Sequence, residues 1–151
     1  MIRSPRKIHK YLSLAISVQL LLWTISGIYF SFNKIEDVRG SQYLKPKEVI
    51  ETTKGNKIEA KQALILVAEK TYLTPQSVTE ITENESGSEY RGRSLPLYKI
   101  EAISEKNKEI NVYVDPFSKK IVAVRSNQWR IWDFMWGIHI MDWNERDNIG
   151  N

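Results

Sequence analysis

The side chains best suited to metal chemistry are two histidines, His9 and His139, because the chain contains no cysteine. His139 is followed at i+3 by Asp142, and further carboxylates lie nearby at Asp133, Glu145 and Asp147. Carboxylates at these spacings are common on polar helix ends, and neither an HExxH motif nor a third histidine is present. We therefore expect no metal site.

Other catalytic patterns are also missing from the sequence. Without cysteine there is no disulfide, no Cys-ligated zinc or iron–sulfur cluster and no thiol nucleophile. The sequence has no G-x-S-x-G elbow, no Walker loop and no G-x-G-x-x-G fingerprint. We expect a protein without catalysis of its own.

The net charge of +4 is concentrated at one end of the chain. Residues 1–10 hold four basic residues and no acidic one, and the remaining charges cancel. A basic tip on a neutral chain does not form the stripe of cations and aromatic rings that follows a phosphate backbone. We therefore expect no nucleic-acid partner.

An apolar segment of 22 residues without a charge runs from 11 to 32. As a helix it is about 33 Å long, enough to cross a hydrocarbon core of about 30 Å. A cleaved signal peptide would be shorter and would end in small residues, whereas bulky residues occupy 28–33. The excess of positive charge before the segment predicts that residues 1–10 are cytoplasmic and that the chain after Asn33 lies across the inner membrane, in the periplasm or outside the cell.

Small and polar residues inside this segment repeat at spacings of three and four, with Leu20 completing the series. They are Ser13, Ser17, Thr24, Gly27 and Ser31. Such a stripe favours close packing with another helix, from a second copy or from another membrane protein. The alternative is that the hydroxyls bond to carbonyls of their own helix.

Beyond a connector at 33–58, which could carry a short helix at 47–53, the pattern is that of an α+β domain at 59–126. Apolar residues from Ala60 to Thr71 have helical spacing, and Thr74-Pro75 is expected to end the helix. Strands are expected at 78–83, 97–104, 110–115 and 120–125, with a flexible stretch at 84–94. A helix on one face of an antiparallel meander would bury these apolar faces.

The last segment, 127–151, contains an aromatic face. Trp129, Trp132, Trp136, His139 and Trp143 follow at spacings of three and four. Because Trp is favoured where lipid meets water, we expect an amphipathic helix at the membrane interface. The alternative is a helix docked on the sheet.

Two parts of the sequence resemble a known family. The hairpin sequence VYVDPFSKKIVAV resembles the PepSY domain, in which Asp-Pro opens a turn that usually contains Thr-Gly; here Ser118-Lys119-Lys120 replaces it. The start RKIHKYLSL and the later SGIYFSF resemble the first helix of the PepSY-associated transmembrane family. In that family a segment like 127–151 leads into another transmembrane helix, which we expect beyond Asn151.

The resemblance implies a PepSY-type module that binds or restrains other proteins, peptidases among them, at the cell envelope. The family is also linked to iron uptake and ferric-siderophore reduction, so the alternative is a component with haem b bound by histidines at helix ends. His9 and His139 would then lie on opposite sides of the membrane, and each would need a ligand from another subunit. Otherwise His9 belongs to the basic tip and His139 is an interfacial polar residue.

Overall fold

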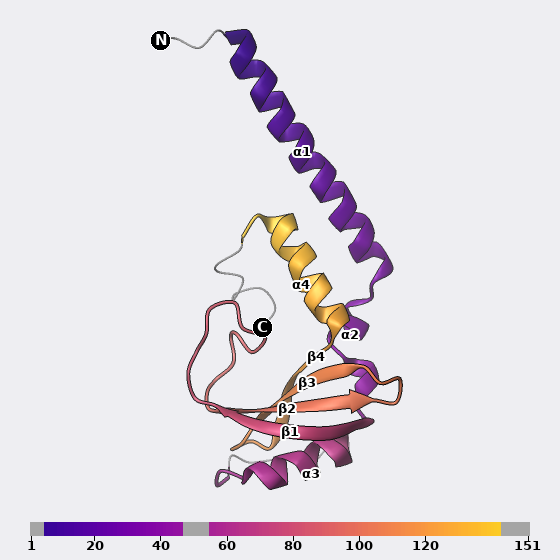
Figure 1. Ribbon diagram of the computed structural model, residues 1–151, viewed down its shortest axis with the longest axis vertical. Coiled ribbons are helices and arrows are strands. Elements are labelled where there is room, and N and C mark those ends of the chain that lie inside the picture. The colour runs from indigo at the N-terminus through magenta and orange to yellow at the C-terminus, as the bar shows by residue number, and fades with distance from the viewer. Residues whose placement is uncertain (1–4, 47–54, 143–151) are drawn as a thin grey trace.

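The computed structural model describes residues 5–46 and 55–142. Helix α1, Pro5–Phe32, extends away from the rest of the molecule (Figure 1). Among the described helices it is the one long and apolar enough to cross a membrane. It starts before the apolar run because proline suits the first helical position and the basic residues after it are good helix formers.

A tight connector joins α1 to the domain. It contains the single-turn helix α2, Ile35–Val38, and the 3-10 helix η1, Ser41–Tyr43. Gly40 lies between them with φ +83°, and a Cβ built on it would come within 2.7 Å of Val124 Cγ1. The connector is therefore pressed against the sheet at a point where only glycine fits. The short helix expected at 47–53 lies outside the described residues.

Helix α3, Ala60–Lys70, forms where the sequence predicted it. Glu59 and Gln62 cap its first turn reciprocally, and Ala63 and Val67 are fully buried. The expected stop at Thr74-Pro75 is wrong: the helix ends at Lys70, and both residues belong to the first strand. Proline is tolerated there because this strand lies at an edge of the sheet.

The four strands form an antiparallel meander in the order β1-β2-β3-β4, which confirms the α+β class. Their bounds are Leu73–Ile81 for β1, Leu97–Ser104 for β2, Glu109–Asp115 for β3 and Lys120–Arg125 for β4. The first strand is longer than expected, and its pairing with β2 shifts between Pro75 and Ser77. A bulge of this kind is common at sheet edges.

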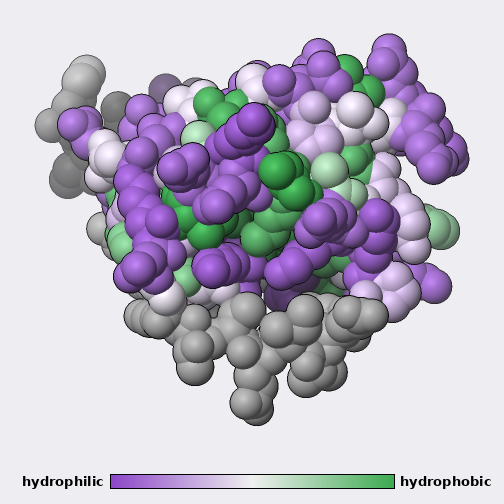
Figure 2. Space-filling view, turned by 90° about the horizontal axis from the view of Figure 1, so that it is seen from below, coloured by the Kyte–Doolittle hydropathy of each residue, from purple (hydrophilic) through white to green (hydrophobic). Residues whose placement is uncertain are grey.

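Both faces of the sheet are covered. Alternate residues such as Ile100 and Val112 face α3 and build the main core, as the alternation predicted. On the other face Leu97, Tyr113 and Ala123 form a smaller cluster with Tyr90 from the β1–β2 connection. Within the stretch expected to be flexible at 84–94, Tyr90 therefore packs on the sheet, while 84–87 and 92–94 are exposed. Seen from the α3 side, the end of the molecule remote from α1 is mainly hydrophilic (Figure 2).

Helix α4, Asn127–Ile140, returns along the lower part of α1 and points away from the sheet (Figure 1). The side chain of buried Ser126 accepts a hydrogen bond from the backbone N–H of Trp129 and caps its start. The chain leaves the helix at Met141 with φ 54°. The two longest helices are therefore antiparallel neighbours that share one end of the domain.

We predict that Gly40→Ala destabilises the protein more than Gly87→Ala. Both glycines have positive φ, so alanine should cost about 1–2 kcal/mol at either site. Only at Gly40 would the new methyl group meet Val124, which should add about 1–3 kcal/mol of overpacking. Urea unfolding of both variants in detergent, followed by far-UV circular dichroism, measures the difference. Equal losses would show that the contact with β4 does not constrain the connector.

Candidate functional site

A cleft of about 620 Å³ opens on the side of the sheet opposite α3. Its walls are the end of β1, the connection that follows it, and side chains from β2 and β3. The lining residues are Thr79, Glu80, Ile81, Thr82, Glu83, Glu85, Gly87, Ser88, Glu89, Tyr90, Lys99, Asn111 and Tyr113. Edge strand β1 therefore forms one border of the cleft.

Carboxylates dominate the charge of this cleft. Glu80 is paired with Lys57, and Lys99, the one cation in the lining, is held by Glu101 at 3.0 Å. Glu83 and Glu85 are exposed at the rim. Glu83 and Glu85 thus give the rim of the cleft an acidic character.

Glu89, on the inner wall, connects three parts of the fold. Its Oε2 accepts hydrogen bonds from Asn111 Nδ2 at 2.7 Å and Tyr113 OH at 3.0 Å, both on β3. Its Oε1 accepts one from Nε of Arg130 on α4. Its backbone carbonyl accepts another from Nε of Arg125 on β4, at 2.9 Å. The connection between β1 and β2 is thereby fixed to two strands and to α4.

This arrangement shifts the pKa values of the groups involved. Burial alone would raise the pKa of Glu89, but the hydrogen bonds from Arg130, Asn111 and Tyr113 outweigh it and leave that pKa below its ordinary value. Burial, followed by the charge of Glu89, raises the pKa of the Tyr113 hydroxyl. Burial, with Arg93 and Arg91 nearby, lowers the pKa of Arg125 to about 10. Glu89 is therefore ionised and Tyr113 neutral at pH 7.

The Trp129 ring contacts two guanidinium groups beside Glu89. The Cζ atom of Arg125 is 4.3 Å from its ring centroid and that of Arg91 is 5.3 Å away. Arg91 also forms an ion pair with Asp133 of α4. The start of α4 is therefore attached to the sheet by charges and one indole.

The rest of α4 packs on α1 through aromatic rings. Phe30 lies 5.1 Å from Trp132, 5.9 Å from Trp136 and 5.5 Å from His139, measured between ring centroids. The indole N–H of Trp23 donates to the backbone carbonyl of His139 at 2.7 Å. This ring-to-ring contact is the seam between the two helices.

A polar contact completes the seam. Ser26 Oγ lies 2.9 Å from His139 Nδ1, and Ser26 has no exposed surface. With Nδ1 engaged, only Nε2 of His139 remains for another partner. Ser26 and Phe30 were not predicted as contact residues, although Trp23, Ser26, Phe30 and Asn33 repeat at spacings of three, four and three on one helix face.

The predicted histidines do not come together. His9 is in the second turn of α1, and His139 contacts Ser26, about 25 Å further along at 1.5 Å per residue. His9 contributes only a 3.5 Å contact with Ser13 Oγ. The described residues contain no group of three or more His, Cys, Asp or Glu that could hold a metal ion.

The expected stripe on α1 is not the face that α4 uses. Ser17, Thr24 and Ser31 donate to carbonyls one turn earlier, at 2.8, 2.8 and 3.0 Å, as in the alternative considered for them. No atom lies within 4 Å of a Cβ built on Gly27. A partner for this stripe stays a prediction, as does the interfacial position of the indoles; Trp143 lies outside the described residues.

Comparison with known proteins gives no relative. No protein-family model matches the chain, and no curated protein or solved structure matches it. The function is therefore inferred from the chemistry of the site.

We predict that Glu89→Gln loosens the contact between the cleft wall and α4. Because the pKa of Glu89 is lowered in the folded state, its ionised form stabilises the fold above its ordinary value of 4.5, and this contribution is lost as the pH falls below that value. At pH 7 glutamine should lower the free energy of unfolding by about 1–2 kcal/mol. The loss is modest because the carboxylate is partly open to solvent. The difference should shrink toward pH 3.

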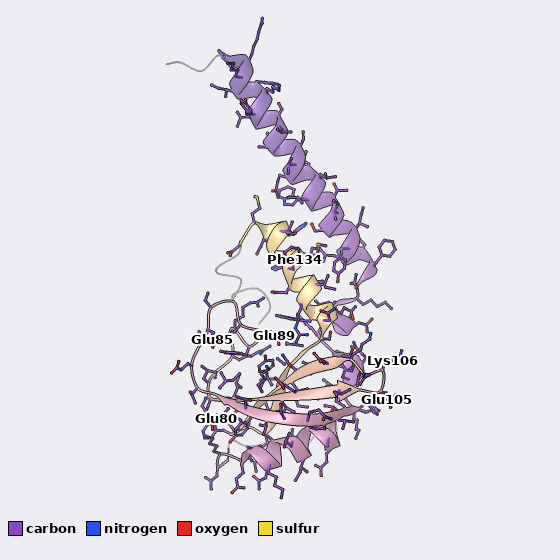
Figure 3. All side chains as sticks on the ribbon, viewed as in Figure 1. Glu80, Glu85, Glu89, Glu105, Lys106 and Phe134 are labelled. Atoms are coloured by element: carbon purple, nitrogen blue, oxygen red, sulfur yellow. The ribbon has the colours of Figure 1, made fainter. Side chains whose placement is uncertain are left out.

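Urea titrations at pH 7 and pH 3 test this, with Glu105→Gln in the exposed β2–β3 turn as control (Figure 3). If Glu89→Gln lowers the free energy of unfolding equally at both pH values, the charge of Glu89 does not hold Asn111, Tyr113 and Arg130 in place.

Proposed function

We propose that the chain is a membrane-anchored, extracytoplasmic binding module of PepSY type that acts on protein partners and has no catalysis of its own. The observation that carries the proposal is the acidic cleft bordered by edge strand β1. An edge strand offers unpaired backbone groups to an extended peptide, and an adjoining cleft can select its side chains. The acidic rim favours a partner segment with lysine or arginine.

The position of the domain follows from α1. Its basic start predicts a cytoplasmic N-terminus, so the cleft would lie outside the inner membrane, in the periplasm or at the cell surface. The hydrophilic end of the molecule, seen in Figure 2, is remote from α1 and suits an aqueous compartment. The stripe from Ser13 to Ser31 would serve contact with another membrane helix.

The hairpin between β3 and β4 supports the PepSY resemblance. Asp115 Oδ1 accepts a hydrogen bond from the backbone N–H of Phe117 at 2.9 Å, and its Oδ2 accepts one from Ser118 Oγ at 2.7 Å. Lys119 takes φ 56°, a conformation that glycine adopts more easily. This chain thus makes the turn with Ser-Lys in place of the family's usual Thr-Gly.

We predict that a photo-crosslinking amino acid at Glu85 captures a protein partner in intact cells, whereas the same residue at Glu105 does not. Both positions are exposed, but only Glu85 lines the cleft (Figure 3). The adduct should be lost when Glu83 is replaced by lysine, because a cation at the rim repels a basic segment, and it should persist with Glu109→Lys at the other end of the sheet. Equal adducts at positions 85 and 105 would exclude the cleft as the binding site.

The second candidate is a haem-binding component of an electron-transfer or ferric-reductase system. The observation in its favour is His139, whose imidazole is held by Ser26 through Nδ1. Two histidines of one chain do not fit a shared haem, since they lie about 25 Å apart along α1. Haem would therefore require a second chain at each site.

An absorption spectrum of the purified full-length protein distinguishes the two candidates. We expect no Soret band, because the proposed binding module holds no haem. A Soret band that is lost in His139→Ala and retained in His9→Ala would instead establish haem at the outer end of α1.

A further inference from the structure

Helix α4 has a second apolar face that the indole pattern conceals. Ile131, Phe134 and Met141 are 42%, 53% and 60% exposed, and half-buried Ile138 completes a series at spacings of three, four and three. Phe134 is about 200° around the helix from both Trp132 and Trp136, which contact α1. By the same helical spacing these four residues, the outer face of α4, are turned away from the seam.

The outer face continues the apolar surface of α1. Gln128 at the start of α4 donates to Asn33 at 3.1 Å, and His139 near its end contacts Ser26, so α4 lies beside the last turns of α1. On α1, Ile25, Ile28 and Phe32 are exposed in the same region. Both helices thus present apolar side chains at one level.

Charge divides α4 into two halves. Arg130 and Asp133 are in its first two turns, where they bind Glu89 and Arg91 of the domain. From Phe134 to Met141 the chain has no Asp, Glu, Lys or Arg. A helix with charges at one end and an apolar remainder suits a boundary between water and lipid.

We propose that the outer face of α4 is immersed in the lipid of the outer leaflet from Phe134 onward, with the boundary between Asp133 and Phe134. The inference rests on the proposed membrane anchoring, and it reassigns the lipid contact from the indole face to Phe134, Ile138 and Met141, with Ile131 just above the boundary. The structure turns Trp132 and Trp136 toward Phe30 of the same chain.

The register of α1 agrees with this boundary. Phe30 contacts Trp132 and Trp136, on either side of Phe134, so it lies near the boundary. A hydrocarbon core needs about 20 helical residues, and counting that number back from Phe30 reaches Lys10, the last charge before the apolar run. The end of α4, level with Trp23, is then about 10 Å below the boundary, within the depth that interfacial helices reach.

Asp142 limits that depth. It directly follows the left-handed residue Met141, at which the helix ends, and an ionisable side chain becomes increasingly costly toward the bilayer centre. Helix α4 therefore enters the outer leaflet without crossing it. The Glu89 cluster then holds the cleft at a fixed height above the lipid.

Spin labels on single cysteines test the immersion, and the chain has no native cysteine to interfere. Labels at Phe134→Cys and Met141→Cys in full-length protein reconstituted into phosphatidylcholine–phosphatidylglycerol vesicles should be accessible to oxygen and protected from a water-soluble nickel complex. A label at Lys106→Cys, in the exposed β2–β3 turn, should show the reverse. Leu21→Cys, 59% exposed on α1, provides the reference for lipid.

Each other outcome has its own meaning. Nickel access at positions 134 and 141 as high as at 106, with position 21 protected, would overturn the immersion of α4 and leave the anchor intact. Low access of both reagents at 134 and 141 would show a covering protein and would equally overturn contact with lipid. Nickel access at position 21 would overturn the membrane anchoring itself.

Discussion

The carboxylate of Glu89 joins the connection between β1 and β2 to the sheet and to α4. It accepts hydrogen bonds from β3 and from α4, while the carbonyl of the same residue binds Arg125 of β4. A partly buried ionised carboxylate is costly unless its oxygens are satisfied, and here they have three donors. The long connection from β1 to β2 therefore becomes a wall of the cleft, and the direction of α4 is set where the helix starts.

The fixed start of α4 also determines how this helix contacts α1. Because α4 starts at a fixed place on the sheet, its indoles meet Phe30 of α1, and Ser26 meets the imidazole of His139. The His139 carbonyl, in the last turn of α4, accepts a hydrogen bond from the Trp23 indole. In an apolar medium such polar contacts matter more than in water, since no solvent can replace them. The cleft and α1 are thus parts of one connected structure.

These contacts fix the orientation of the cleft relative to α1, which matters for the proposed binding of a partner. A binding module that is merely tethered by α1 could take any orientation above the membrane. Here the connector is pressed against Val124 through Gly40, and α4 provides a second attachment through Arg91 and Asp133. A partner segment would therefore meet the cleft at a defined height and angle, which favours partners that are themselves membrane proteins.

The local hydrophobic pattern of the sequence was enough to predict most of the helices and strands. The apolar run of α1, the spacing of α3 and the alternation along β2 and β3 each reflect a single element that buries one face, so composition and period suffice to find them. The α+β class follows because such a helix and such strands need each other's apolar faces. The placement of Thr74-Pro75 in a strand was missed because proline is compatible with an edge strand, and edges are not visible in sequence.

Only the tertiary structure decided which faces meet. The series Trp129, Trp132, Trp136 and His139 has one helical period, yet the first indole lies between arginines and the others contact α1. The small-residue stripe of α1 is equally periodic, but α4 packs on Trp23, Ser26 and Phe30 instead. Periodicity shows that one face of a helix differs from the others. Which element packs on that face depends on contacts between residues more than 90 positions apart, such as Asn33 with Gln128. The role of Glu89 was hidden for the same reason, because a carboxylate in a polar loop becomes a structural centre only when folding brings three donors to it.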